Sequence, residues 1–236
     1  MAAINNRSKS VILDNEDNYY HKSKNLLTDM VYEHLISKLM NKEIVPGQVL
    51  SRRQLAEELG VSIAPVVEAL NRIELEGFIE SIPRKGTIVR PVKKQDFYER
   101  FIMREAIECT AARLYTGLPV QWNKDELMEY ASKIDKMEHQ TISHSKVEII
   151  FHSSLVNLAG IPLLTNEFLR VARVGTFCMI NQVDFDHGLI HYEHVNLIEQ
   201  LTKSSPDEAE KIVREHIWSG NPIRAKYDLI PGLIRD

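Results

Sequence analysis

The chain has 236 residues, a formal net charge of −4 and 44% hydrophobic residues. This composition is typical of a globular protein with one large domain or two ordinary ones, and it argues against a uniformly basic nucleic-acid binder. The two cysteines, Cys109 and Cys178, lack the spacing of a zinc finger or of a disulfide framework. No run of about 18 apolar residues and no signal-peptide pattern occur, so we expect a cytoplasmic protein without a membrane span.

Charge is distributed unevenly along the chain. Residues 24–94 contain 11 Lys or Arg residues against 9 Asp or Glu residues, whereas residues 95–236 contain 15 against 21. Because only the first of these two segments has a positive balance, only this segment is suited to face the phosphates of a nucleic acid.

The N-terminal region predicts a tail followed by a helix. Residues 1–23 are polar and show no sustained hydrophobic period, which predicts a flexible tail. Between residues 24 and 42, apolar residues recur at spacings of three and four, which predicts a helix packed on one face. The sequence Val45-Pro46-Gly47 then breaks the pattern. The predicted buried residues of this helix are Leu27, Met30, Val31, Leu35, Leu39 and Met40.

Two further helices follow, separated by a tight turn. Ser51 and Gln54 form a capping box for the first of them, which ends at Gly60. Ser62 is placed to cap the second, which ends at Gly77. The apolar spacing of this second helix predicts one buried and one exposed face. The buried face comprises Val66, Ala69, Leu70 and Ile73, and the exposed face comprises Ile63, Ala64, Val67 and Asn71.

A short segment after these helices predicts a β-hairpin. Residues 78–82 and 87–89 are β-type runs joined by a Pro-Arg-Lys-Gly turn. The order helix, helix, tight turn, helix and hairpin indicates a winged helix-turn-helix, in which the third helix projects and can enter a DNA major groove. We therefore interpret residues 24–92 as a DNA-binding domain.

From residue 93 to residue 236 the pattern is helical. The predicted helices are joined by connections of a few residues, which indicates an antiparallel α-bundle within the size range of one domain. The expected fold is therefore mostly α, with an N-terminal winged helix-turn-helix domain followed by an all-α antiparallel helical bundle. The predicted helices of the bundle span residues 95–116, 124–140, 145–159, 163–183, 189–203 and 206–226.

The bundle contains a set of residues suited to bind a metal ion. Glu148 and His152 are four residues apart on one predicted helix, and so lie on one face. His194 and His216 lie on two later helices, and three helices of a bundle can direct such side chains to one interior point. One carboxylate and three imidazoles suit Zn²⁺, Ni²⁺ or a similar divalent ion.

Other interpretations of these residues are open from spacing alone. A helical histidine is more often a surface residue or a satisfied core residue than a ligand. A metal held by Glu148 and the histidines could also activate water, as in a metal-dependent hydrolase-like enzyme. Against an enzyme, the sequence has no nucleophile motif and no glycine-rich phosphate loop. We expect the remaining histidines near these segments, His144, His187 and His191, to lie at the surface.

Six segments together carry a resemblance to one family of regulators. They are LSRRQLAEELGVSIAPVVEALNRIELEGFI (50–79), PRKGTIV (83–89), MREAIECTAARL (103–114), EIIFHSSLVNLAG (148–160), EHVNLIEQL (193–201) and AEKIVREHI (209–217). On these motifs the chain resembles the GntR-family transcription regulators of the FadR subfamily, whose C-terminal half is the all-helical FCD domain. The resemblance implies a homodimer that binds double-stranded operator DNA, with residues 93–236 serving dimerisation and effector binding.

The chain departs from the family pattern at the start of the third helix. The usual pattern resembles G-V-S-R-T-P-V-R-E-A-L, with both arginines facing DNA, whereas this chain has Ile63 and Val67 at those positions. An arginine can bond guanine through two donors, but an apolar side chain can only contact a thymine methyl group. Either these residues contact thymine-rich steps, or the surface binds a partner protein; basic residues retained nearby favour DNA. The expected DNA-contacting residues are Arg52, Arg53, Ser62, Ile63, Ala64, Val67, Arg72, Arg84, Lys85 and Gly86.

The resemblance also assigns roles within the bundle. Its metal-binding positions, normally an aspartate and three histidines, coincide with Glu148, His152, His194 and His216. Because Glu148 stands where aspartate is usual, its longer side chain would ligate differently, lie behind the ligands, or leave a metal-free site in which the histidines bind an anion.

Arg104 and Glu108 match the R-x-x-x-E pattern of the family. Arg104 either pairs with Glu108 inside the bundle or binds the carboxylate of an effector. Arg170 and Arg173 are weaker candidates for the same role. A metal ion and an arginine together imply a small carboxylic acid as effector, such as a sugar acid or another organic-acid metabolite.

Overall fold

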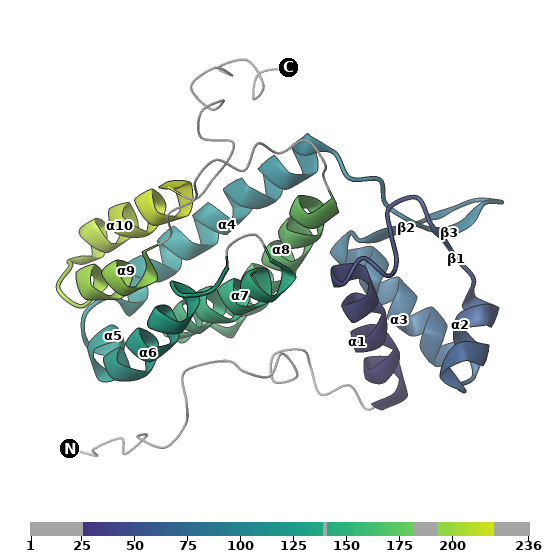
Figure 1. The fold of residues 1–236 in the computed structure, drawn as a ribbon, viewed down its shortest axis with the longest axis horizontal. Helices are drawn as coiled ribbons and strands as arrows, with labels where there is room; N and C mark the ends of the chain where they lie inside the picture. The colour runs from purple at the N-terminus through teal and green to yellow at the C-terminus, as the bar shows by residue number, and fades with distance from the viewer. Residues whose placement is uncertain (1–25, 139–140, 182–192, 220–236) are drawn as a thin grey trace. The chain divides into compact units, whose positions relative to one another are not determined.

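The computed structural model describes residues 26–138, 141–181 and 193–219 (Figure 1). These residues form two compact units. The winged unit comprises residues 26–103 and 170–181, and the helical unit comprises residues 104–138, 141–169 and 193–219. Helices α4 (Lys94–Tyr115) and α8 (Pro162–Asn181) each contribute residues to both units.

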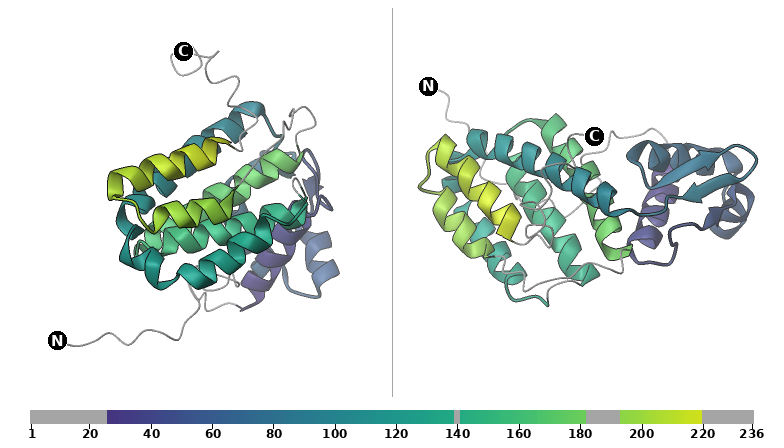
Figure 2. Two further views of the ribbon diagram at one scale, coloured as in Figure 1. Left: turned by 60° about the vertical axis from the view of Figure 1, so that its left-hand side comes forward. Right: turned by 90° about the horizontal axis from the view of Figure 1, so that it is seen from above.

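Besides parts of α4 and α8, the winged unit contains three whole helices and a small antiparallel sheet. The helices are α1 (Leu26–Met40), α2 (Arg52–Leu59) and α3 (Ile63–Glu76). The strands are β1 (Val49–Leu50), β2 (Ile79–Ile82) and β3 (Gly86–Val89), arranged in the order β1-β3-β2. The hairpin of β2 and β3 is visible in the right-hand view of Figure 2. In its register Ser81 pairs with Thr87. The expected winged helix-turn-helix is confirmed, with one strand, β1, that the sequence did not predict.

Capping residues fix the bounds of α2 and α3. Oγ of Ser51 accepts a hydrogen bond from the backbone N–H of Gln54 at 3.3 Å, as the predicted cap requires. Gly60 then ends α2 in a left-handed conformation with a φ of 64°, which glycine adopts without steric cost. Ser62 occupies the N-cap position of α3, but its side chain makes no capping hydrogen bond, contrary to our prediction.

Helix α3 packs its buried face against α1. The four residues of α3 that the sequence predicts to be buried are all buried. In α1, however, Leu27 and Met30 are exposed, because 3.6 residues per turn place them on the side away from Tyr32 and Leu39. The buried face of α1 consists of Thr28, Val31, Tyr32, Leu35, Ile36, Leu39 and Met40.

The helical unit is built from helices alone in its described residues. Besides parts of α4 and α8, it contains α5 (Leu118–Trp122), α6 (Lys124–Ile134), α7 (Ile142–Asn157), α9 (His194–Leu201) and α10 (Pro206–Ser219). In this unit α6 packs against α7 and α9, and α9 packs against α10. The expected fold class, a winged helix-turn-helix followed by a helical domain, is therefore confirmed.

The bounds of several bundle helices differ from the predicted ones. The sequence did not predict α5, because its five residues are too few to show a hydrophobic period. Helix α6 ends at Ile134 rather than at residue 140. The predicted tail of residues 1–23 and the predicted helical residues 189–192 and 220–226 lie outside the described residues. Within the described part of the chain, no helix combines the length and the hydrophobicity needed to span a membrane.

Candidate functional site

Two arginines at the start of α2 are exposed. Arg52 and Arg53 occupy the first turn of the helix, directly after its cap. The side chain of Arg53 is 84% exposed, and its Nε lies 3.0 Å from Oε1 of Glu57. Ion pairs between exposed side chains contribute little to the free energy of folding. The guanidinium of Arg53 can therefore leave Glu57 and contact a phosphate instead.

Helix α3 presents a partly apolar face to solvent. Ile63 is 52% exposed, Ser62 and Ala64 are exposed, and Val67 is partly exposed. None of these four side chains has a guanidinium or amide that could bond a purine through two donors or acceptors, whereas Asn71, farther along the same face, is also exposed and has an amide. Ile63 and Val67 instead have the apolar surface that suits a thymine methyl group.

The turn between β2 and β3 carries the predicted wing residues. Arg84 has a φ of 67°, which is uncommon for a residue other than glycine. Arg84, Lys85 and Gly86 are all exposed. Together with Arg52 of α2, this turn borders an open groove of about 520 Å³. The groove is lined by Leu50, Arg52, Ser81, Ile82, Pro83, Arg84, Gly86 and Thr87.

Arg72 does not lie with these exposed residues. Its Nη1 is 3.1 Å from Oδ1 of Asp29, and its guanidinium stacks over the ring of Tyr32 at 3.7 Å. The hydroxyl of Tyr32 donates a hydrogen bond to the carboxylate of Glu76, whose pKa is raised by burial. Arg72 is therefore held within the winged unit, which corrects the expectation that it faces DNA.

Three histidines from three helices meet inside the helical unit. His152 of α7, His194 of α9 and His216 of α10 each offer one ring nitrogen, and these nitrogens all lie within 4.8 Å of one another. The ring centroids of His194 and His216 are 4.9 Å apart, and those of His152 and His194 are 5.7 Å apart. The structure thus brings together the three histidines that the sequence selected. We refer to them below as the histidine cluster.

Two carboxylates orient these rings. Oε2 of Glu108 lies 2.6 Å from Nδ1 of His152. Oδ1 of Asp135 lies 2.7 Å from Nδ1 of His194, and the two oxygens of Asp135 also accept the backbone N–H groups of His194 and Val195. A carboxylate beside Nδ1 favours the tautomer with the proton on that nitrogen, which leaves the Nε2 lone pair for a metal ion. Sequence reasoning missed Asp135, because its role depends on contact with a residue 59 positions away.

Glu148 lies beside the histidine cluster. Its Oε1 is 3.0 Å from Nε2 of His194, and its Oε2 is 3.4 Å from Nε2 of His152. The side chain is only 12% exposed. Burial alone would raise the pKa of Glu148, but contacts with His152 and His194 hold it well below its usual value. An ionised carboxylate therefore lies against two imidazoles.

His194 and His216 differ in charge in the absence of a metal ion. Burial lowers the pKa of His194, but contacts with Asp135 and Glu148 outweigh it and raise the pKa to about 9. Burial, together with the neighbouring His152 and His194, lowers the pKa of His216 well below its ordinary value. At neutral pH His194 is therefore protonated and His216 is neutral.

The donor set fits a divalent metal ion. Nε2 of His152 is buried and makes no hydrogen bond within the described residues. Buried polar atoms of this kind are uncommon in folded proteins unless an ion or a water satisfies them. Metal–nitrogen bonds of about 2.1 Å place two ligand atoms roughly 3 to 4 Å apart. The ring nitrogens of the three histidines, which lie within 4.8 Å of one another, therefore need to move only slightly closer together to surround an ion.

Arg104 forms the internal ion pair that one interpretation predicts. Its Nε contacts Oε1 of Glu108, whose other oxygen contacts His152. Burial opposes ionisation of Glu108, but Arg104 and His152 lower its pKa to about 2. Arg104 keeps 23% of its side chain exposed. Contact between Arg104 and an effector stays a prediction.

The other two arginine candidates belong to the winged unit. Arg173 is buried, and its Nη1 donates a hydrogen bond to the hydroxyl oxygen of Tyr32 at 3.1 Å. Arg170 and Arg173 both lower the pKa of Glu76 electrostatically, against the larger effect of burial. The structure thus gives them a role beside Tyr32 and Glu76 rather than in the histidine cluster.

His144 is not the surface residue that we expected. It is 4% exposed, and its Nε2 lies 3.6 Å from Oε1 of Glu148. His144 lies one turn before Glu148 on α7, so the two side chains share the face that the structure shows to be turned inward. His187 and His191 lie outside the described residues.

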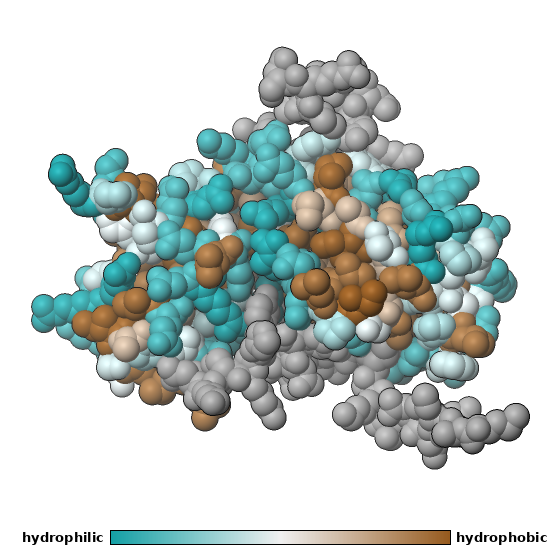
Figure 3. Space-filling model, turned by 180° about the vertical axis from the view of Figure 1, so that it is seen from behind, coloured by the Kyte–Doolittle hydropathy of each residue, from teal (hydrophilic) through white to brown (hydrophobic). Residues whose placement is uncertain are grey.

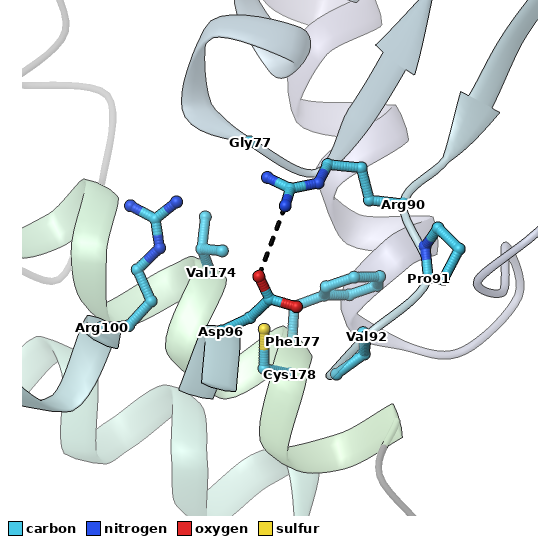
Figure 4. Close-up of a pocket in the computed structure, with 9 residues that line it drawn as sticks. All are labelled: Gly77, Arg90, Pro91, Val92, Asp96, Arg100, Val174, Phe177 and Cys178. Carbon is cyan, nitrogen blue, oxygen red and sulfur yellow. Dashed lines mark hydrogen bonds and ion pairs between the residues drawn. The ribbon is translucent and has the colours of Figure 1, made fainter. Parts of the chain in front are cut away.

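Two hollows differ in their capacity for a ligand. One, of about 260 Å³, lies between α9 and α10 and is bordered by His216. Its lining comprises Glu193, Asn196, Leu197, Gln200, Ile212, Glu215, His216 and Ser219. The other lies in the winged unit beside the ion pair of Arg90 and Asp96, and its volume of about 10 Å³ corresponds to roughly one water molecule (Figure 4). Of these two, only the hollow beside the histidine cluster approaches the size of a small metabolite.

The two units define a class of protein. A winged helix-turn-helix with exposed arginines is a DNA-binding module, and a helical domain with buried donors is suited to a small ligand. This is the organisation of a DNA-binding transcription regulator with a sensory domain. The family described as bacterial regulatory proteins, gntR family, matches residues 27–89, and the FCD domain matches residues 99–218. The chain belongs to the GntR family and carries an FCD domain, which is consistent with the FadR subfamily.

Relatives of this chain are transcription regulators. It is 26% identical over 212 residues to the HTH-type transcriptional regulator YdhC of Bacillus subtilis, covering 86% of this chain and 90% of YdhC. It is 23% identical over 199 residues to the HTH-type transcriptional repressor RspR of Escherichia coli, covering 81% and 86% of the two chains. A GntR regulator from Rhodococcus sp. RHA1 has the same fold, with a TM-score of 0.66 at 19% identity over 87% of this chain and 98% of that one. The family and these relatives identify the chain as a transcription regulator and not an enzyme.

Proposed function

We propose that this chain is a homodimeric regulator that binds a specific double-stranded operator and senses a small carboxylic acid through a divalent metal ion. Residues 24–92 bind DNA, and residues 93–236 bind the effector and hold the dimer together, in the cytoplasm. The observation that carries this proposal is the meeting of His152, His194 and His216 beside Glu148, in a chain whose other unit is a DNA-binding fold.

The proposed DNA surface contains cations that contact the backbone and apolar side chains that contact bases. The exposed cations of α2 and of the wing contact phosphates or a groove edge, which fixes the position of the protein on the duplex. Ile63 and Val67 contact base edges, and their apolar side chains favour thymine over guanine at those steps. The proposed contacting residues are Arg52, Arg53, Ser62, Ile63, Ala64, Val67, Arg84, Lys85 and Gly86.

The proposed sensor combines a metal ion with an arginine. Each histidine of the cluster would hold the ion through Nε2, and Glu148 would contribute an oxygen, a donor set suited to Zn²⁺ or Ni²⁺. The ion supplies a positive centre for the carboxylate of a sugar acid or another organic acid. The partly exposed guanidinium of Arg104 supplies a second cation within the same hydrogen-bonded chain, because Glu108 joins Arg104 to His152.

Exposed apolar side chains support self-association of the helical unit. Leu114, Leu118 and Trp122 follow one another at four-residue intervals across the end of α4 and α5, and Trp122 is 76% exposed. Figure 3 shows hydrophobic residues gathered on the face of the molecule that is seen from behind. Exposed apolar patches mark interaction surfaces, and a two-fold dimer would present two copies of α3 to two half-sites.

Metal affinity is expected to rise with pH. Because the pKa of His194 is about 9 in the metal-free protein, Ni²⁺ must displace its proton at pH 7. The apparent affinity for Ni²⁺ should therefore increase about tenfold per pH unit from about pH 7 to about pH 9 and then level off. Competition with a chelator of known pH dependence measures this slope. An affinity that is constant over this range would contradict the assignment of His194 as a ligand.

Operator binding with and without metal and acid tests the proposed function. A labelled operator fragment, selected from random DNA, is titrated with Ni²⁺-loaded or EDTA-stripped protein in the presence of gluconate or citrate, with xylitol as the uncharged control. We expect a carboxylic acid to change operator affinity about tenfold or more, and to raise the Tm, only in the metal-loaded protein. An equal response of the stripped protein would instead support a metal-free sensor. Equal binding to operator and random DNA at moderate salt would contradict sequence-specific regulation.

A further inference from the structure

The carboxylate of Glu148 lies between two histidines of its own helix. His144, Glu148 and His152 are spaced by four residues on α7, so their side chains form one stripe along the helix. Oε1 of Glu148 is 3.6 Å from Nε2 of His144, and Oε2 is 3.4 Å from Nε2 of His152. A third imidazole, that of His194, approaches Oε1 at 3.0 Å from α9. Glu148 therefore contacts two members of the histidine cluster and one histidine outside it.

His144 is fixed in the first turn of α7. Oγ of Thr141, the N-cap residue, accepts a hydrogen bond from the backbone N–H of His144 at 3.0 Å. The imidazole is buried, and it is not among the three described histidines whose ring nitrogens lie within 4.8 Å of one another. His144 thus contacts the carboxylate of Glu148 without belonging to the donor group itself.

A glutamate at position 148 needs such a contact. Its side chain has one more rotatable bond than that of aspartate, so the carboxylate has more orientations to lose when it is fixed in one place. Buried carboxylates also require donors on their oxygens to compensate for lost hydration. At 3.6 Å from Oε1 the imidazole of His144 makes no hydrogen bond with this oxygen, but it lies close enough to restrict the orientation of the carboxylate and to attract its charge when protonated.

We propose that His144 is a positioning residue of the metal site, which directs its Nε2 toward Oε1 of Glu148 and holds this carboxylate at the histidine cluster. This inference rests on the proposed metal-dependent function. It makes the effects of His144 and Glu148 on metal affinity depend on each other, because the histidine restricts the additional freedom of the longer glutamate side chain.

A double-mutant cycle tests this coupling with Ni²⁺ as the probe. EDTA-stripped, full-length wild type, His144→Ala, His144→Gln, Glu148→Asp and the double variant His144→Ala/Glu148→Asp are titrated with Ni²⁺ against a competing chelator. We expect His144→Ala to lower Ni²⁺ affinity about tenfold or more, as the loss of a partner behind a ligand does. We expect His144→Gln to restore most of the affinity, because its amide N–H can occupy the place of Nε2–H. In the Glu148→Asp background, His144→Ala should change the affinity by less than about twofold.

The controls distinguish positioning from folding and from direct ligation. Thermal unfolding of each stripped variant reports whether it folds. His34→Ala is the control for the loss of a histidine elsewhere, because His34 lies in the winged unit, 4.0 Å from Glu58. Unchanged Ni²⁺ affinity in His144→Ala would overturn the role of His144 and leave the proposed metal site intact. An absence of Ni²⁺ binding in the wild type would overturn both. If His144→Gln is as weak as His144→Ala and the visible spectrum of the Co²⁺ protein shows a lost imidazole, His144 is a ligand and the positioning role is wrong.

Discussion

Replacing His194 by alanine is expected to lower the affinity of the protein for Ni²⁺ by on the order of 10²- to 10³-fold. Structural zinc sites with four ligands bind with roughly 10–16 kcal/mol, so one ligand accounts for about 2.5–4 kcal/mol. The substitution also removes the imidazole that contacts both Asp135 and Glu148, so two carboxylates lose a partner at once. The same variant should lose the metal-dependent response of operator binding to a carboxylic acid.

Asp135→Asn is the matched comparison for this variant. It keeps the ring of His194 but weakens the acceptor on Nδ1, so the loss of Ni²⁺ affinity should be smaller, about 10- to 100-fold. Circular dichroism of the stripped proteins shows whether each variant folds. If folded His194→Ala binds Ni²⁺ as tightly as the wild type, the histidine cluster is not the metal site.

Replacing Arg53 by alanine is expected to weaken operator binding roughly 10- to 100-fold at about 0.1 M salt. The side chain is 84% exposed and occupies the first turn of α2, where it can reach a phosphate. Binding of the wild type should depend steeply on salt, because each phosphate contact releases counterions. In a dimer two such contacts are lost, so the slope of log affinity against log salt should become less steep by about 2. Fluorescence anisotropy of a labelled operator across a salt series gives both quantities.

Lys211→Ala is the control for the Arg53 experiment. Lys211 is also an exposed cation, but it lies on α10 of the helical unit and pairs with Glu215 at 3.9 Å. Its removal changes the net charge equally and should leave the salt slope unchanged. If both variants reduce affinity to the same extent, the effect of Arg53 is one of overall charge, and the assignment of a local phosphate contact is wrong.

The parts of the fold that could be predicted from the sequence depend on interactions between near neighbours. Ser51 caps α2 through a residue three positions later, and Gly60 ends the same helix by its own backbone conformation. Strand β1 has only two residues, and it forms because Val49 pairs with Ile88 of β3, far along the chain. A two-residue strand defined by such a partner leaves no local hydrophobic period, so the sequence could not indicate it.

In the candidate site, too, some features could be predicted from nearby residues, whereas others depend on residues far along the chain. His152, His194 and His216 could be selected because each occurs on a recognisable helix, and because the resemblance to a family connects the three. The inward position of His144 depends on which face of α7 is buried, and spacing alone cannot decide this. Arg72 carries a charge that suggests exposure to DNA, but Asp29, 43 residues earlier in the chain, holds it within the fold.

Helix α4 gives the hydrogen-bonded chain from Arg104 to His152 a mechanical consequence. Its 22 residues contain neither glycine nor proline, the residues at which helices most often kink. Glu108, which contacts the ring of His152, lies in the second half of α4. Residues 94–103, at the start of the helix, belong to the winged unit. Because Glu108 contacts the ring of His152, movement of that ring would displace the turns of α4 that lie in the helical unit.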